Sequence, residues 1–201
     1  MVAGLDLAGS PARDSGFCVL TGPRQARASI LHSDGEVLRV LAETRPLLTL
    51  VDAPLSLPRG RATIEDRSGP HFRECDRELR RLGIRFFPLT LGPMRMLTVR
   101  GMRLAGALRE RGLTVEEGYP GGAQDLLGIP RKQEGAAPLQ RALRRRGIEG
   151  DLAGGLLTHD ELDAVTLAWV ARLHLQGEAQ TIGDPSEGIM VLPRRRTNSR
   201  R

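Results

Sequence analysis

Short apolar runs separated by turn residues divide the first quarter of the chain into strands. Residues 2–8, 16–22 and 26–32 each form such a run, and the connections between them are brief. Strands joined by so few residues are typical of an antiparallel meander. The run 47–52 is almost continuously apolar, which is typical of a strand covered on both faces. The pattern therefore predicts three antiparallel strands followed by one buried strand.

Helical periodicity and strand patterns alternate along the rest of the chain. Ser33 with Glu36, and Thr158 with Glu161, form capping-box patterns that open two predicted helices. The predicted helices cover 34–44, 72–82, 94–111 and 159–175, with short helices within 121–150. A further strand is predicted over 113–117 and a terminal hairpin over 179–192. This order predicts an α/β fold with a mixed central sheet flanked by helices.

Length and charge indicate one domain with a basic end. A chain of 201 residues can bury one substantial core, so we predict a single domain over 1–193. Residues 194–201 contain five arginines and no acid, and they account for most of the formal net charge of +6. We expect this tail to be disordered, and either to solubilise the chain or to attract phosphates without sequence preference.

Other features of the composition favour a cytoplasmic protein. No apolar run approaches the roughly 20 residues that a membrane helix needs, and no signal-peptide pattern precedes the first strand. Cys18 and Cys75 are too few for a disulfide framework, and two reduced thiols are expected. Trp169 and Tyr119 are the only residues of their types, which argues against a dedicated single-strand binding module.

Two acids interrupt or end apolar strands. Asp6 lies within the first predicted strand, where a carboxylate is costly unless it is paired or binds a metal. Asp52 ends the buried strand just before a proline-rich loop. Ligands of open α/β sheets bind outside the carboxyl ends of strands. If the two strands are parallel neighbours, both carboxylates reach one edge, and their repulsion favours a divalent cation between them.

The last predicted helix supplies a second pair of acids. Asp160 and Asp163 are three residues apart, so they share a helix face, and both lie in the first turns, where the helix dipole favours negative charge. Leu162, Val165 and Trp169 form the apolar stripe that would hold this helix against the sheet. His159, next to the cap, could assist proton transfer, although a structural role is the simpler interpretation.

Oxygen ligands of this kind suit Mg²⁺ or Mn²⁺. Our hypothesis places two such ions side by side. Asp6 bridges them, Asp52 and Asp163 each complete the ligands of one ion, and Asp160 supports the second ion. Glu117, at the end of the strand over 113–117, is a further candidate catalytic acid. It is favoured over Glu116 because it adjoins the following turn.

Five segments resemble the family known as domain of unknown function 429. They are residues 4–10 (GLDLAGS), 51–58 (VDAPLSLP), 73–77 (RECDR), 117–120 (EGYP) and 159–164 (HDELDA). The resemblance implies a predicted nuclease with a ribonuclease-H-like fold, in which a meander precedes alternating helices and strands. It also implies a nucleic-acid partner, DNA or RNA. Asp160 and Asp163 resemble the helix carboxylates of Holliday-junction resolvases, but Asp52 stands where those enzymes tend to have Glu.

Three residues are candidates for substrate binding. Arg73 and Arg77 are four apart on one predicted helix face and could clamp a phosphate, or they could be salt-bridged to neighbouring acids on the surface. Ser10 is the third candidate. The segment 6–10 also resembles the phosphate loop of the sugar-kinase and actin class, so an ATP-binding phosphotransfer protein is one alternative. A non-catalytic nucleic-acid or protein-binding module on the same fold is another.

Overall fold

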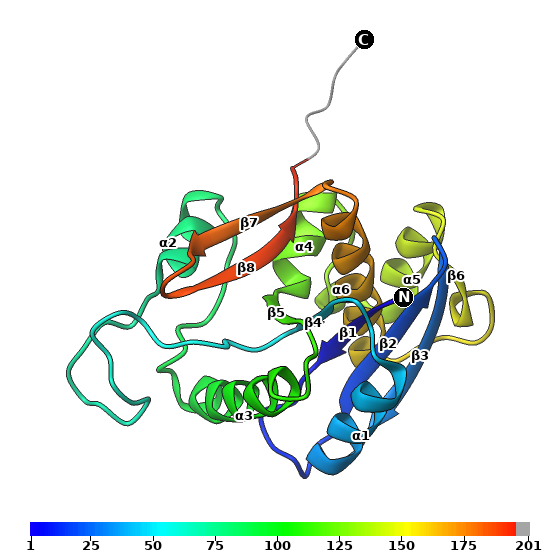
Figure 1. Cartoon of the computed structure of the whole chain (residues 1–201). Helices are drawn as coiled ribbons and strands as arrows, with labels where there is room; N and C mark the ends of the chain where they lie inside the picture. The colour runs from blue at the N-terminus through cyan, green and yellow to red at the C-terminus, as the bar shows by residue number, and fades with distance from the viewer. Residues whose placement is uncertain (196–201) are drawn as a thin grey trace.

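A mixed sheet with helices on both faces forms the centre of the computed structural model, which describes residues 1–195 (Figure 1). The strands are β1 (Val2–Asp6), β2 (Ser15–Thr21), β3 (Gln25–Leu31), β4 (Thr49–Val51), β5 (Val115–Gly118), β6 (Glu149–Gly150), β7 (Ala179–Asp184) and β8 (Gly188–Pro193). The α-helices are α1 (Asp34–Thr44), α2 (Glu74–Arg81), α3 (Gly92–Arg109), α4 (Pro120–Leu127), α5 (Ala136–Arg145) and α6 (His159–Leu175). Two 3₁₀ helices, Lys132–Glu134 and Asp151–Ala153, complete them.

The strand order is β6-β3-β2-β1-β4-β5-β8-β7. β1, β2 and β3 pair antiparallel, as the short connections predict. β4 then pairs parallel with β1, and β5 pairs parallel with β4, with Leu5 opposite Val51 and Val51 opposite Glu117. The predicted mixed sheet, an antiparallel meander extended by parallel strands, is confirmed. This arrangement brings the carboxyl ends of β1, β4 and β5 to one edge.

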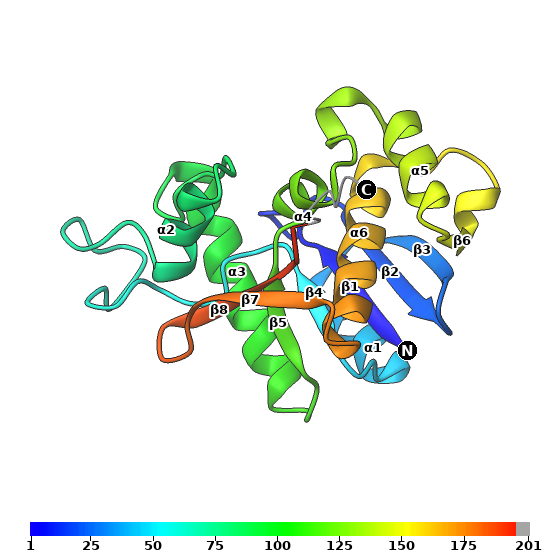
Figure 2. The ribbon, with the colours of Figure 1, turned by 90° about the horizontal axis from the view of Figure 1, so that it is seen from above.

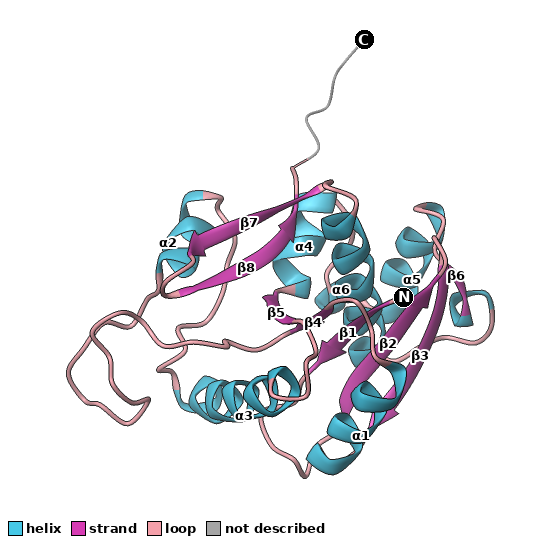
Figure 3. Cartoon of the chain, in the orientation of Figure 1, coloured by secondary structure: helices cyan, strands magenta, loops and turns pink. Residues whose placement is uncertain are grey.

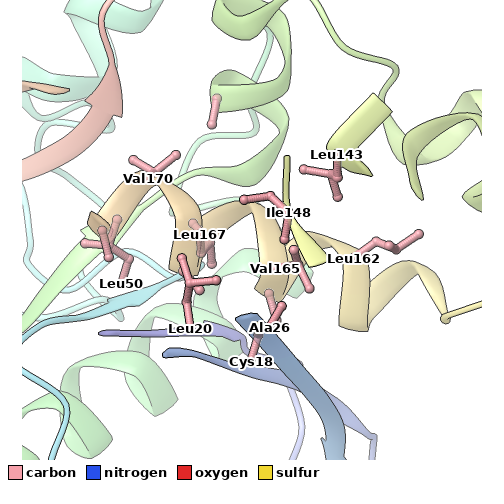
Figure 4. Packing of buried hydrophobic residues seen from close by; sticks show 14 of the residues in the cluster. Cys18, Leu20, Ala26, Leu50, Leu143, Ile148, Leu162, Val165, Leu167 and Val170 are labelled. Carbon is pink, nitrogen blue, oxygen red and sulfur yellow. The ribbon is translucent and has the colours of Figure 1, made fainter. Parts of the chain in front are cut away.

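Helices cover the two faces of the sheet unequally (Figures 2 and 3). α1 and α3 pack on one face, against side chains such as Leu5, Phe17 and Val51. α4, α5 and α6 pack on the other face, where α6 lies against the middle strands. Figure 4 shows Leu162, Val165, Leu167 and Val170 of α6 over Leu20 and Leu50 of the sheet. α6 is therefore buried along most of its length.

Glycines let α6 approach the sheet closely. A Cβ atom added to Gly4 in β1 would lie 2.1 Å from the carbonyl oxygen of Ala164, and one added to Gly16 in β2 would lie 2.0 Å from that of Asp160. No side chain larger than hydrogen fits at either position without moving the helix. These two glycines thus fix the height of the first turns of α6, which carry the predicted acids, above β1 and β2.

Most predicted elements agree with the structure to within a few residues. Ser33 and Thr158 cap α1 and α6, and each hydroxyl accepts the backbone N–H three residues later at 3.2 Å. The predicted hairpin forms, but β8 also joins the main sheet beside β5, and the two-residue strand β6 was not predicted. Strand pairings of this kind depend on partners distant in the sequence.

The structure also bears on the cysteines, on membrane-spanning helices and on the basic tail. Cys18 and Cys75 are both buried and free, as expected. Within residues 1–195 no helix combines the length and apolarity that a membrane span requires. The tail predicted over 194–201 lies outside the described residues except for Arg194 and Arg195.

Candidate active site

Asp6 and Asp52 lie side by side at the carboxyl ends of two parallel strands. The Asp52 N–H donates to the Leu5 carbonyl oxygen at 2.9 Å, which continues the ladder between β1 and β4. Side chains alternate along a strand, so Asp6 shares a face with Val2 and Asp52 shares a face with Leu50. Val2 and Leu50 both belong to the apolar cluster under α6. Both carboxylates therefore point to the face that α6 covers.

Asp163 reaches the same place from α6. It is almost fully buried, with 2% of its surface exposed, while Asp160 one turn earlier is half-buried. The capping box holds the start of the helix, since the Thr158 N–H donates to the Glu161 carboxylate at 2.8 Å. Asp160 contributes to the electrostatic repulsion that Asp6 and Asp163 experience, so it lies close to them without being enclosed.

Asp6 and Asp163 are buried, Asp52 is half-buried, and the three carboxyl groups lie close enough to influence one another. Burial, followed by the charges of Asp52 and Asp163, raises the pKa of Asp6 well above its ordinary value. Burial and Asp163 likewise raise the pKa of Asp52 to about 7, although a side-chain hydrogen bond with Asp6 partly opposes this. Burial also raises the pKa of Asp163. Three carboxylates drawn together in this way favour a proton or a cation among them.

Lys132 and Gln124 offset part of the negative charge of Asp163. The Lys132 ammonium lies 3.2 Å from one oxygen of Asp163, and it also lowers the pKa values of Asp6 and Asp52. The Gln124 amide donates to the other oxygen of Asp163 at 2.6 Å. Lys132 is the only lysine of the chain, so a unique residue type faces the acids. One ammonium offsets at most one of the three negative charges.

The donor chemistry at this site fits a hard divalent cation. Asp6, Asp52 and Asp163 offer only oxygen ligands, which Mg²⁺ and Mn²⁺ prefer, and their pKa values are raised first by burial and then by neighbouring carboxylates. Among residues 1–195, however, no group of three or more His, Cys, Asp or Glu side chains is arranged so that it could hold a metal ion as it stands. The three acids thus lie near one another without forming a metal site as they stand, and the Lys132 ammonium lies 3.2 Å from Asp163.

Glu117 differs from the expectation of a free catalytic acid. Its two oxygens accept hydrogen bonds from the Arg73 guanidinium at 2.6 and 2.7 Å, and one of them also accepts the Leu55 N–H at 2.9 Å. Arg73 binds Asp76 as well, at 3.0 Å, and is 2% exposed. Glu117 thus lies in a buried ion-pair network. Glu116, the alternative, is half-buried and lies near Arg109.

Arg73 and Arg77, the predicted phosphate clamp, both have acidic partners. Arg73 is enclosed by its two carboxylates, and Arg77 lies on the surface, where it pairs with Glu74 at 3.2 Å. The two arginines therefore have different environments, and neither presents a free guanidinium to the acids. The sequence showed their common helix spacing but not the partner of Arg73, which is 44 residues away.

Ser10 and His159 also lie apart from the buried acids. Ser10 accepts the Ala12 N–H at 3.2 Å and lines a second, shallower depression beside Arg95 and Arg100. His159 is exposed at the first position of α6. The structure therefore brings Asp6, Asp52 and Asp163 together, with Asp160 near them, and leaves these two residues outside the group.

Asp52 and Asp163 open into a cleft of about 870 Å³, which Asp6 does not line. Asp52, Asp163, Gln124 and Lys132 line its inner part. Its outer part is bounded by α2 and by the loop that follows it, which contribute mainly apolar and arginine side chains. The cleft is thus polar and acidic at one end and largely apolar at the other.

Sequence patterns did not single out Lys132 or Gln124. Lys132 lies in a 3₁₀ helix and Gln124 in the short helix α4, and both were covered only by the general prediction of short helices over 121–150. The one signal that pointed to Lys132 was its uniqueness among 30 basic residues.

Comparison with known proteins identifies a family. A family described as "Protein of unknown function (DUF429)" matches residues 4–188. No curated protein matches the chain. Two structures of RuvC from Thermus thermophilus are similar over 88% of this chain and 96% of theirs. The one in complex with a Holliday junction substrate has 17% identity and a TM-score of 0.45, and the other has 16% and 0.43. Similarity at this level does not assign a reaction to this chain.

Proposed function

This chain belongs to the DUF429 family, and we propose that it is a nuclease that hydrolyses phosphodiester bonds with the help of Mg²⁺ or Mn²⁺. One observation carries the proposal. Buried Asp6 of β1, half-buried Asp52 just after β4 and buried Asp163 of α6 lie close together, and one lysine opposes their charge. An arrangement that is costly for a protein alone becomes favourable when a divalent cation binds.

The residues of the chain have distinct parts in this proposal. Asp6, Asp52 and Asp163 would hold the cation, and Asp160 at the rim would add negative charge beside it. Gln124 orients Asp163 through its hydrogen bond of 2.6 Å. A bound divalent cation would supply the charge that activates a water molecule and stabilises the leaving oxygen of a phosphodiester.

Lys132 and Glu117 act beside the three acids. The Lys132 side chain is 44% exposed and borders the cleft, so its ammonium can also donate to a phosphate oxygen. Glu117 binds Arg73 and the Leu55 N–H, and in this way fixes the start of the loop that follows Asp52. We therefore assign Glu117 a positioning role, not a role as metal ligand.

Cleavage by purified protein tests this function. Full-length chain with Mn²⁺ or Mg²⁺ is incubated with single-stranded, duplex, hybrid and branched DNA and RNA. We expect cleavage that EDTA abolishes and that Asp6→Asn reduces by about 100-fold or more, as removal of a group that acts in the transition state does.

The matched control is Glu43→Gln, which removes one exposed negative charge from α1, far from the acids in the fold. We expect this variant to retain full activity. Cleavage that persists unchanged in Asp6→Asn, or in EDTA, would show that another site is responsible. Oligonucleotide binding without cleavage under any metal would favour the non-catalytic module instead.

A further inference from the structure

Aromatic side chains gather in the cleft beside the buried acids. Phe72, Phe86, Phe87 and Tyr119 all line it. These are three of the four phenylalanines of the chain and its single tyrosine. Trp and Tyr are scarce in this chain, but three phenylalanines from two short segments meet at one place.

One of these rings is much more exposed than a packing role requires. Phe87 has 69% of its surface exposed. Phe72 and Phe86 are half-buried and form an edge-to-face pair, with centroids 6.0 Å apart and planes at 86°. Buried Leu79, Ile84 and Leu89 form part of the same lining. The result is an apolar wall with an exposed aromatic ring, supported by packed neighbours.

Positive charge without an acidic partner accompanies these rings. Four arginines line the cleft: Arg73, Arg80, Arg85 and Arg131. Arg73 and Arg131 are paired with carboxylates. Within residues 1–195 no ion pair engages Arg80 or Arg85, and the Arg80 guanidinium lies 4.2 Å from the centroid of the Phe72 ring. These two exposed cations are therefore available to an anionic ligand.

A nucleotide has both chemical features that this outer part of the cleft would recognise. Its base presents a flat π-face, which stacks on aromatic side chains, and its phosphates attract arginine. Bases within a regular duplex are stacked on their neighbours and expose no face to a protein wall. The volume of about 870 Å³ is within the range of clefts that enclose a small ligand. The exposed aromatic surface and the enclosed cleft therefore both favour unpaired nucleotides over a duplex.

We infer that the cleft binds an unpaired nucleotide, whose base stacks on Phe87 and whose phosphates contact Arg80 and Arg85. The inference rests on the proposed function and narrows it, because it makes single-stranded or locally unpaired nucleic acid the substrate class. The stacked nucleotide would lie next to the phosphodiester that enters the acidic end of the same cleft.

Binding without cleavage tests this inference. Fluorescence polarisation of a labelled mixed-sequence oligonucleotide is measured in EDTA with the full chain, using single-stranded DNA, single-stranded RNA and the corresponding duplexes. We expect the single strand of at least one sugar type to bind tighter than its duplex. Phe87→Ala should weaken single-strand binding about tenfold, which corresponds to the usual contribution of one stacked base.

Two further variants make the result specific. Phe87→Trp should retain the affinity, and its added tryptophan emission should be quenched when a base stacks on it. Leu47→Ala removes a side chain that is 67% exposed in the connection before β4, and it should change nothing. Thermal melting establishes that each variant is folded, as expected for substitutions of exposed residues.

The outcomes separate the inference from the proposed function. Single-strand affinity that is unaffected by Phe87→Ala, or equal affinity for strand and duplex, would overturn the inference even if the enzyme cleaves. The absence of any oligonucleotide binding would overturn it as well. Stacking on Phe87→Trp in a protein that cleaves nothing with any metal would uphold the inference and refute the nuclease.

Discussion

At the scale of single residues, the buried network of Arg73 makes a sharp prediction. Arg73→Met leaves Glu117 and Asp76 buried without their cation, and breaking a buried pair typically costs about 3–5 kcal/mol. We expect a loss of this size in the free energy of unfolding, measured with urea. Arg77→Met is the matched control, because its exposed pair with Glu74 should contribute less than about 1 kcal/mol. Equal effects of the two substitutions would refute the assignment.

The raised pKa of Asp52 predicts how stability depends on pH. Burial and Asp163 raise this pKa from 3.8 to about 7 in the folded protein. Between these values the folded protein holds a proton that the unfolded chain has released, so the free energy of unfolding of the metal-free protein should fall as the pH rises through this window. Asp52→Asn should flatten the fall, which melting curves in EDTA from pH 4 to pH 8 would show. A steeper fall in the variant would contradict the assigned shift.

Lys132 predicts a competition with metal. Lys132→Met removes the one cation beside Asp163, so the metal-free protein should melt about 2–4 °C lower, the shift for a loss of roughly 1 kcal/mol at this chain length. With Mn²⁺ the ammonium no longer competes, and the rise in melting temperature should exceed that of wild type. Lys132→Arg, which keeps the charge, serves as control. A smaller metal-induced rise in Lys132→Met would instead make the lysine a supporter of metal binding.

At the scale of elements, Gly16 sets the position of α6. Gly16→Ala adds a Cβ atom 2.0 Å from the Asp160 carbonyl oxygen, so the first turns of the helix must move. We expect a loss of stability of about 1–3 kcal/mol or more and weaker Mn²⁺ binding, because Asp160 and Asp163 move with the helix. Urea denaturation and calorimetry measure the two effects.

Gly106→Ala is the matched control for this substitution. Gly106 lies within α3, and nothing lies within 4 Å of the position its Cβ would take. The substitution should raise stability by up to about 1 kcal/mol, since alanine is the better helix former. Unchanged Mn²⁺ affinity in Gly16→Ala would mean that the close contact does not position the acids.

At the scale of the whole molecule, the sequence predicts secondary-structure elements better than it predicts the tertiary contacts between them. The capping residues Ser33 and Thr158, and the apolar runs of β1 and β4, mark their elements locally, so these were foreseen. The convergence of Asp6, Asp52 and Asp163 could also be anticipated, because parallel neighbouring strands present their carboxyl ends at one edge.

Features that depend on distant partners were not foreseen. Arg73 and Glu117 are 44 residues apart, and no local pattern distinguishes a buried ion pair from a surface arginine. The pairing of β8 with β5 also joins distant segments. Lys132 and Asp163 are 31 residues apart in the sequence, and they meet at 3.2 Å only in the tertiary structure. These tertiary contacts place Arg73 and Glu117 in a buried ion-pair network and bring Lys132 beside the acids.

Calorimetric titration of Mn²⁺ into the metal-free full chain measures most directly whether the three acids form one cation site. We predict that wild type and Glu43→Gln bind Mn²⁺ with the same affinity, and that Asp6→Asn and Asp163→Asn each bind at least about tenfold more weakly, because β1 and α6 contribute to one ligand set. Wild-type affinity in both aspartate variants, or no binding to wild type, would contradict this account.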